Sequence, residues 1–286
     1  MIYDVIIIGK GPAGISASLY TARANLKTLI IGKNESALSN AKEIENYYGF
    51  EQPVSGQELL DNGISQAQNL GIEIITDEVV GISYQDNLIV KTVNGEHKAK
   101  AIVLATGTKR SKPKIKGVKE YEGKGISYCA VCDGFFHKNK NVAVIGSGDY
   151  AVLEALELTP IVNSVTILTN GKEAREVRNP KITFNNKIVT EVRGDDTQVQ
   201  TIEFEDDSSL DISGVFIAEG TAAALDLAKK IGIETEGNNI VVDTHMRTSV
   251  PGVFACGDCT GGVFQISKAV YEGTQAGLAV IEFLKS

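Results

Sequence analysis

The stretch DVIIIGKGPAGISASLYTARAN, residues 4–25, joins an apolar run, a glycine-rich turn and a segment with helical spacing. A short apolar run such as residues 4–8 is typical of a strand buried on both faces. In GxGxxG spacing, the first glycine makes the turn, the second lets a pyrophosphate approach the backbone, and the third lets the helix pack on the strand. The phosphates then face the helix N-terminus. The stretch therefore predicts a dinucleotide-binding unit built on Gly9, Gly11 and Gly14.

The same pattern recurs in NVAVIGSGDYAVLEALEL, residues 141–158. It predicts a strand at 141–145, a second glycine turn from Gly146 to Ala151, and a helix that ends near Pro160, because proline cannot continue a helix. Two such units in one chain predict an α/β fold with two doubly wound, Rossmann-like domains.

Composition narrows the class of protein further. The chain has 286 residues and a net charge of −8, which disfavours nucleic acid as a partner. Its apolar runs are too short to cross a bilayer, so we expect no membrane insertion. Its N-terminus enters a strand without a basic leader, and four cysteines are too few for a secreted disulfide scaffold. These features predict a cytoplasmic protein.

A redox-active segment precedes the second glycine turn. Cys129 and Cys132 form a CxxC pair followed by Asp133 and Gly134. Two cysteines at this spacing can close a small disulfide ring, and a helix start can lower the pKa of one thiol. The segment predicts thiol–disulfide chemistry, for which an electron source is required.

The order of motifs along the chain resembles a known family. After the first glycine turn come ATG at 105–107, CAVCDG at 129–134, and GD at 257–258 before an expected final helix at 264–284. This order resembles the flavoprotein disulfide reductases, and the CxxC position and ENYYGF at 45–50 resemble the low-molecular-weight thioredoxin reductases. The resemblance runs along essentially the whole chain.

The resemblance implies a domain plan and an assembly. Residues 1–111 and 244–286 would form an FAD-binding domain, and residues 112–243 a domain inserted into it that carries the CxxC pair. It also implies a homodimer, with thioredoxin as the substrate.

The same resemblance assigns roles to single residues. Cys132 would receive electrons from the flavin, Cys129 would attack the substrate disulfide, and Asp133 would act as the acid or base for the thiol proton. The implied FAD contacts are Gly9, Gly11, Pro12, Ala13, Gly14, Leu38, Asn46, Val79, Thr106, Gly107, Gly257, Asp258, Gln265 and Ile266. The family's Gly-Gly-Gln segment is replaced here by residues 35–38, so Leu38 is assigned by position alone.

A second CxxC pair, Cys256 and Cys259, overlaps the GD motif. Two CxxC pairs can indicate zinc, but the separation of the pairs and the demand of the flavin on Asp258 disfavour a metal site. We expect these thiols to be packed. The three histidines show no ligand spacing, and we expect them at the surface.

The expected nicotinamide site lacks its usual residues. The strand at 164–168 runs into TNGK (169–172), where NADPH-linked reductases carry an HRRxxxR cluster for the 2′-phosphate. Tyr150 should crowd the groove, residues 219–223 replace a glycine-x-x-Pro-Asn stretch, and Phe264 stands where those enzymes carry arginine. The pattern resembles the ferredoxin-dependent flavin thioredoxin reductases of anaerobic bacteria, which implies ferredoxin as the electron donor.

Charge along the chain is consistent with such a donor. Residues 109–140 hold nine Lys or Arg against three acidic residues, which indicates either a solvated linker or a docking patch for an acidic ferredoxin.

Two alternative functions stay open. One is an NADPH-dependent reductase with an atypical nucleotide site or a second flavin in the altered groove, and the other is a flavin-binding redox sensor without turnover.

Overall fold

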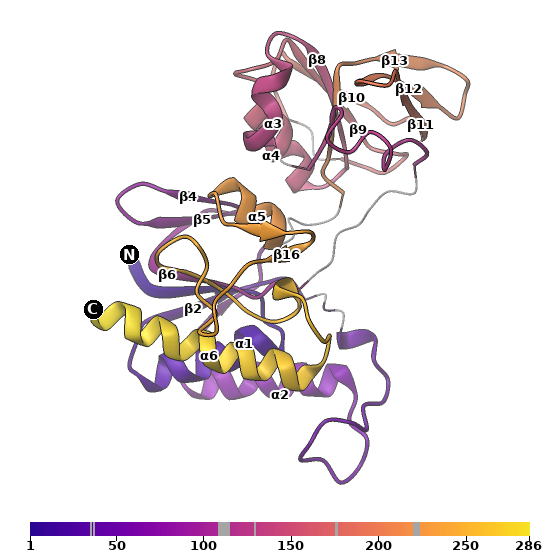
Figure 1. Cartoon of the computed structure of the whole chain (residues 1–286). Coiled ribbons are helices and arrows are strands. Elements are labelled where there is room, and N and C mark those ends of the chain that lie inside the picture. The colour runs from indigo at the N-terminus through magenta and orange to yellow at the C-terminus, as the bar shows by residue number, and fades with distance from the viewer. Residues whose placement is uncertain (35, 37, 108–114, 129, 175–176, 220–223) are drawn as a thin grey trace. The chain divides into compact units, whose positions relative to one another are not determined.

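The computed structural model divides into two compact units (Figure 1). It describes residues 1–286 except 35, 37, 108–114, 129, 175–176 and 220–223, and it leaves the side chains of residues 40, 131 and 132 undescribed. The first unit comprises Met1–Lys109 and Ala223–Ser286, and the second comprises Arg110–Ala222.

The first unit is built on a mainly parallel sheet in the order β3-β2-β1-β6, with β17 paired to the end of β6. These strands are β1 (Ile2–Ile8), β2 (Thr28–Ile31), β3 (Glu73–Ile75), β6 (Glu96–Leu104) and β17 (Val253–Ala255). An antiparallel hairpin of β4 (Val79–Tyr84) and β5 (Leu88–Thr92) continues the sheet from the first half of β6. The carboxyl ends of β1, β2, β6 and β17 therefore meet at one edge.

Three helices cover one face of this sheet (Figure 1). They are α1 (Pro12–Arg23), α2 (Gly56–Asn69) and α6 (Ile266–Lys285). Helices α1 and α6 approach closely. A Cβ atom on Gly273 would lie 2.2 Å from the Ala13 carbonyl oxygen, and one on Gly277 would lie 2.7 Å from the Ala17 carbonyl oxygen. Glycine at both positions lets the two helices touch through their backbones.

The second unit contains a parallel sheet in the order β10-β9-β8-β14-β7 and a separate antiparallel sheet. The parallel strands are β7 (Ile126–Ser127), β8 (Asn141–Ile145), β9 (Ser164–Leu168), β10 (Ile182–Asn185) and β14 (Gly214–Ile217). The antiparallel strands are β11 (Val189–Gly194), β12 (Val199–Phe204) and β13 (Ser209–Asp211). Its helical segments are α3 (Ala130–Asp133), η2 (Gly134–His137) and α4 (Asp149–Leu158).

The second boundary differs from the expected one at residue 243. Helix α5 (Ala224–Lys230) packs on β4, and the small hairpin of β15 (Thr235–Glu236) and β16 (Asn239–Ile240) packs on α5 and on η3 (Asp258–Thr260). The Lys230 ammonium also donates to the Val80 carbonyl. These contacts group α5 and the hairpin with the first unit.

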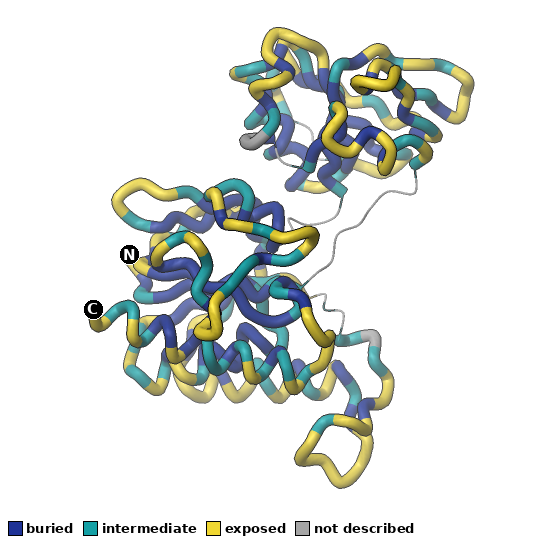
Figure 2. Tube along the Cα trace, viewed as in Figure 1, coloured by how far each residue is buried: buried dark blue, intermediate teal, exposed yellow. Residues whose placement is uncertain are grey.

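Buried residues follow the strands of each parallel sheet (Figure 2). Two side chains differ from expectation. Tyr150 is 2% exposed and belongs to the core of the second unit, so the expectation that it crowds a groove is wrong. His137 is 7% exposed and stands edge-on to Phe216, so it is not a surface residue.

The two glycine-turn units on parallel sheets confirm the predicted fold class. Within the described residues, no helix is long and apolar enough to span a membrane.

Candidate functional site

The first glycine turn joins β1 to α1 with almost no space behind it. Gly9 has φ +118°, and a Cβ there would lie 2.2 Å from the Ala105 carbonyl oxygen. A Cβ on Gly14 would lie 2.0 Å from the Gly9 carbonyl oxygen. A Cβ on Gly11 would meet nothing within 4 Å, so the space in front of the helix is open. The turn is thus closed on the protein side and open on the side where a phosphate would sit.

Groups around this open side are suited to a bound anion and its sugar. Helix α1 begins with Pro12 and has neither a side-chain cap nor an acidic residue in its first turn. A helix N-terminus in this state presents unpaired N–H groups and a positive dipole end. The buried Thr106 hydroxyl, just beyond β6, has no hydrogen-bond partner among the described residues, and Gly107 follows with φ +73°. A dinucleotide would supply a partner for that hydroxyl.

The Gly257–Asp258 turn lies directly against this region. Gly257 has φ +83°, and a Cβ there would lie 2.9 Å from the Ala13 Cβ. Asp258 begins η3, where burial raises the pKa of its carboxyl while Lys268 opposes the rise. The structure therefore brings the GD motif, α1 and the end of β6 together at the carboxyl edge of the sheet.

An ion pair on α6 holds this turn in place. The Lys268 ammonium lies 3.0 Å from the Glu272 carboxylate and donates to the carbonyls of Gly257 and Gly261 at 2.8 and 2.6 Å. The Glu272 carboxylate accepts from the Gly257 N–H at 2.8 Å and from the Thr260 hydroxyl at 2.8 Å. Every group in the pair has a partner, so the pair fixes the turn that presents Asp258.

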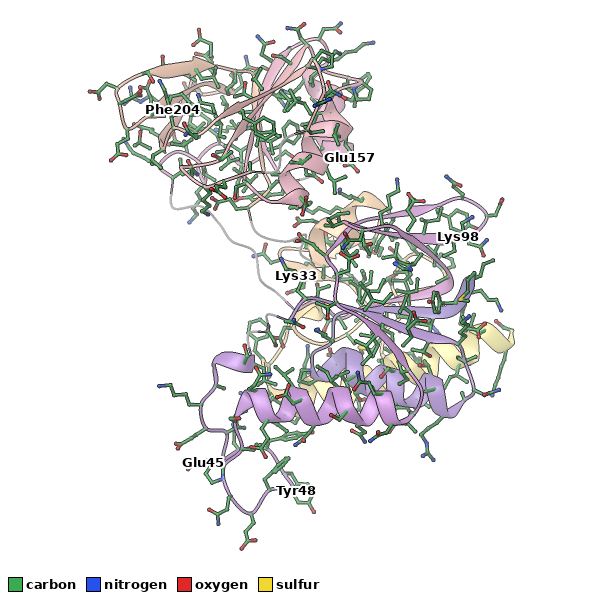
Figure 3. All side chains as sticks on the ribbon, turned by 180° about the vertical axis from the view of Figure 1, so that it is seen from behind. Lys33, Glu45, Tyr48, Lys98, Glu157 and Phe204 are labelled. Atoms are coloured by element: carbon green, nitrogen blue, oxygen red, sulfur yellow. The ribbon has the colours of Figure 1, made fainter. Side chains whose placement is uncertain are left out.

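Two expected contacts from distant parts of the chain also meet. The Asn46 amide donates to the Gln265 side-chain oxygen at 3.3 Å. Gln265 is the N-cap residue of α6, and Ile266 is its first helical residue. Asn46 belongs to an exposed loop that carries Glu45 and Tyr48 (Figure 3). The link orients this loop toward the start of α6.

Among the described residues, no hydrogen bond links Leu38 or Val79 to this cluster. Leu38 begins η1 (Leu38–Asn40), and its carbonyl packs against Gly56 at the start of α2. Val79 is buried at the start of β4, opposite Thr92. Their assignment as cofactor contacts stays a prediction.

Part of the redox segment lies on a short helix of the second unit. Cys132 and Asp133 belong to α3, whereas Cys129 falls outside the described residues. The Asp133 carboxylate accepts from the Ser127 hydroxyl at 2.6 Å. On α4, the 1% exposed Glu154 carboxylate accepts from the Ala130 N–H at 2.7 Å. These two bonds tie both ends of α3 to neighbouring elements.

The second CxxC pair is packed, as we expected. Cys256 and Cys259 are buried free thiols, and the Cys259 thiol donates to the Leu104 carbonyl. Burial raises the pKa of Cys259 to about 12 and that of Cys256 well above its usual range. Thiols in this state are poor nucleophiles. Within the described residues, no group of His, Cys, Asp and Glu has metal-site geometry.

The second glycine turn repeats the closed geometry of the first. A Cβ on Gly146 would lie 2.2 Å from the Ala218 carbonyl oxygen, beside the end of β14. At the tip of β9, however, the chain makes a tight turn. Asn170 has φ +50°, and its side chain accepts from the Val189 N–H at 2.9 Å. The Gly171 N–H donates to the Asn186 carbonyl.

The carboxyl edge of the first unit fits a flavin dinucleotide. It offers an open glycine turn, an uncapped helix start, a buried hydroxyl with no partner among the described residues, and Asp258 on a turn that Glu272 holds. Together with a CxxC segment on a second dinucleotide fold, this site defines the class of flavoprotein oxidoreductases that exchange electrons with a dithiol.

Comparison with known proteins gives the family. The chain belongs to the pyridine nucleotide-disulphide oxidoreductase family, whose model matches residues 3–273. The family's members are FAD-dependent flavoproteins, which confirms the expected cofactor. The chain is 38% identical to the thioredoxin reductase of Aquifex aeolicus over 303 residues, covering 99% of this chain and 94% of the relative.

Two solved structures are similar over nearly the whole length. The atypical thioredoxin reductase TRi from Desulfovibrio vulgaris Hildenborough matches with a TM-score of 0.92 and 39% identity, covering 99% of this chain and 98% of that one. A ferredoxin-flavin thioredoxin reductase from Clostridium acetobutylicum matches with a TM-score of 0.72 and 30% identity, covering 99% and 98%. The expected resemblance to both groups is confirmed.

Sequence reasoning missed several residues that hold the site. Glu154, Lys268 and Glu272 support the redox segment and the GD turn. Glu154 gave a usable signal, because it is a charged residue within the otherwise apolar run AVLEAL. Lys268 and Glu272 have i,i+4 spacing, which usually indicates only a surface pair.

Proposed function

We propose that the chain is a thioredoxin reductase that works in the cytoplasm and uses reduced ferredoxin as its electron donor. The observation that carries the activity is the Cys132–Asp133 end of the CxxC motif on α3, with Asp133 bonded to Ser127 at 2.6 Å, in a chain with a flavin-type site. The homodimer stays a prediction.

When bound, FAD would accept electrons one at a time from an iron–sulfur donor and pass them on in pairs, as reduction of a disulfide requires. Two electrons open the Cys129–Cys132 disulfide to a dithiol. The Cys129 thiolate then attacks the thioredoxin disulfide to form a mixed disulfide, and Cys132 displaces reduced thioredoxin and restores the starting disulfide. Asp133 exchanges the thiol proton, and two electrons and two protons pass in total.

The tip of β9 supports a donor other than a pyridine nucleotide. A 2′-phosphate would need a cluster of cations at this tip, yet Lys172 is the only Lys or Arg in residues 164–174, and Arg175 follows later in the chain. Asn170 and Gly171 instead form a left-handed turn that is bonded to Val189, the first residue of β11, and to Asn186 before it. The energetics also permit the transfer, because a ferredoxin near −400 mV and a thioredoxin near −270 mV differ by about 130 mV, or roughly 6 kcal/mol for two electrons.

The basic stretch at 109–140 is the proposed docking surface for ferredoxin. Lys119, Lys124 and Lys138 are exposed. Lys116 differs, because its ammonium lies 2.8 Å from the Glu191 carboxylate, which reduces its value as a docking charge. The described part of the stretch therefore has several exposed lysines that are close in sequence to the redox segment.

A specific observation favours the second candidate, an NADPH-dependent reductase. The second unit keeps a closed glycine turn at Gly146, and the matching family model is that of pyridine nucleotide-linked enzymes. The turn alone is compatible with a dinucleotide on α4.

One experiment separates the two donors. The oxidised holoprotein is mixed anaerobically with reduced ferredoxin, NADPH or NADH, and flavin absorbance and thioredoxin thiols are followed together. We expect fast flavin bleaching and thiol release with ferredoxin, and rates at least a hundredfold lower with either nucleotide. Fast bleaching by a nucleotide would overturn the ferredoxin assignment and leave the reductase activity intact.

Docking by charge adds a second test. We expect ferredoxin-driven turnover to fall at least tenfold between low and high salt, and to fall further in a Lys119→Glu/Lys124→Glu variant. The matched control is Lys98→Glu, which removes an exposed lysine of the first unit. Salt-insensitive rates would remove the docking surface.

Trapping tests turnover against the redox-sensor alternative. The assigned roles predict that Cys132→Ser accumulates a mixed disulfide between Cys129 and thioredoxin, whereas Cys129→Ser does not. Trapping by Cys129→Ser instead would exchange the two roles. Failure of both variants to trap thioredoxin would support a sensor.

A further inference from the structure

The tip of β2 carries a glycine where dinucleotide folds carry an acid. In such folds an Asp or Glu about 20 residues after the glycine turn accepts hydrogen bonds from the ribose hydroxyls. Here the first residue after β2 is Gly32, and its N–H donates to the Ile75 carbonyl at 3.1 Å. The first unit therefore lacks the usual ribose ligand at the usual place.

The space beside Gly32 is filled by Lys10, the residue between the first two glycines of the turn. A Cβ on Gly32 would lie 3.1 Å from the Lys10 backbone nitrogen and 3.2 Å from its Cγ. These distances are tighter than ordinary contacts, so a larger side chain at position 32 would displace Lys10. Glycine at 32 and lysine at 10 are thus complementary in volume.

The Lys10 ammonium is held at the same edge by two polar groups. It donates to the Asn34 side-chain oxygen at 2.6 Å and to the Thr76 hydroxyl at 3.1 Å. Asn34 follows β2 and Thr76 follows β3, so both come from strand ends beside the glycine turn. Among the described residues, the hydrogen-bond partners of this ammonium are neutral, so none of them cancels its charge.

We propose that Lys10, supported by Asn34 and Thr76, binds the adenosine ribose of FAD in place of the acid that Gly32 omits. Lys10 would donate to the ribose hydroxyls, whereas a carboxylate accepts from them. The inference rests on the FAD site described above. It makes Lys10 a specificity-determining residue for the adenosine end of the cofactor.

Replacing the usual carboxylate by the Lys10 ammonium should change which adenosine ligands the site prefers. A carboxylate at this point repels a phosphate on the ribose, whereas an ammonium attracts it. We therefore expect adenosine 2′,5′-bisphosphate to compete with FAD for the apoprotein at least as well as adenosine 5′-phosphate does. Lys10→Met should reverse that order.

The test measures the rate at which FAD leaves the diluted holoprotein, followed by the rise in flavin fluorescence. We expect Lys10→Met to release FAD at least tenfold faster than the parent, and Gly32→Glu to release it faster still. The double variant Lys10→Ser/Gly32→Glu removes the steric conflict and restores an acid, so it should return to within about threefold of the parent rate. This rescue separates a ribose contact from a folding defect.

Matched controls make the outcome specific. Lys33→Met removes a neighbouring charge whose ammonium is already 3.1 Å from the Glu78 carboxylate, and it should change release by less than twofold. Equal release from Lys10→Met and the parent would overturn the proposal, as would equal losses in Lys10→Met and Lys33→Met. A parent protein purified without FAD would instead count against the cofactor site itself.

Discussion

The two glycine turns have the same backbone conformation at their second glycine but differ in what stands beside them. Gly11 and Gly148 are both N-cap residues, with φ −83° and ψ −176° in the first unit and φ −85° and ψ 178° in the second. A Cβ atom added to the first glycine of either turn would lie 2.2 Å from the carbonyl oxygen of an alanine at the end of a neighbouring strand. That alanine is Ala105 for Gly9 and Ala218 for Gly146. Close strand–helix packing requires this shape with or without a ligand.

The difference lies at the tips of the second strands. At β2, Gly32 makes room for Lys10, whose ammonium reaches Asn34 and Thr76. At β9, Asn170 makes a left-handed turn and bonds to the Val189 N–H. The first tip keeps polar groups for a ligand, whereas the second uses its polar group to bind its own chain. A glycine motif therefore predicts a fold more securely than it predicts a ligand.

The largest expected effect, loss of FAD, comes from one of two matched substitutions, one in each glycine turn. Valine at position 11 or 148 fits the backbone, because φ near −85° is open to any L-residue. Gly11→Val places a side chain where the pyrophosphate would sit, so we expect a folded protein purified without FAD. Gly148→Val should keep its FAD and its ferredoxin-driven turnover.

The flavin content and the activity with each donor are measured on both variants. A Gly148→Val protein that loses a nucleotide-driven activity present in the parent would show that the second groove binds a nucleotide. FAD retained at full occupancy in Gly11→Val would contradict the site in the first unit.

Much of the fold follows from local sequence pattern. The strands at 141–145 and 164–168 appear at the predicted residues, because each is a short, mostly apolar run bounded by polar residues or glycine. The last helix begins at Ile266 rather than 264, since Gln265 takes the N-cap position. The domain boundary was harder to place, because α5 is a short helix whose unit is decided by its contacts with β4.

The site was less visible than the fold. Family resemblance suggested Asn46 and Gln265, and the structure joins them by a hydrogen bond across 219 residues of chain. No local pattern could show that Glu154 accepts from Ala130, or that Lys10 fills the space above Gly32. The burial of His137 also depends on tertiary contacts, because its ring fills the space above Gly214.

The second prediction compares the two CxxC pairs. Burial raises the pKa of Cys259 to about 12, so its thiolate fraction at pH 8 is far below that of an ordinary thiol. After reduction of the native protein, we expect two thiols to react with an alkylating reagent, and Cys256 and Cys259 to react on the order of a thousandfold more slowly. Mass spectrometry of alkylated peptides assigns each thiol, and the denatured protein, which should expose four thiols, serves as the control. Fast native labelling of Cys256 would contradict the packed state.

The smallest expected effect tests the turn at the tip of β9. Asn170→Ala removes the acceptor for the buried Val189 N–H and places alanine at φ +50°, which together should lower the free energy of unfolding by about 2 kcal/mol. Asn25→Ala is the matched control in the first unit, since Asn25 has φ +61° and is exposed, and it should cost about 1 kcal/mol. Denaturant unfolding gives both values, and amide hydrogen exchange at Val189 reports the lost bond directly. If the two variants lose equal stability and exchange at Val189 is unchanged, the Asn170 side chain does not hold this turn, and the tip of β9 would be free to rearrange around a nucleotide.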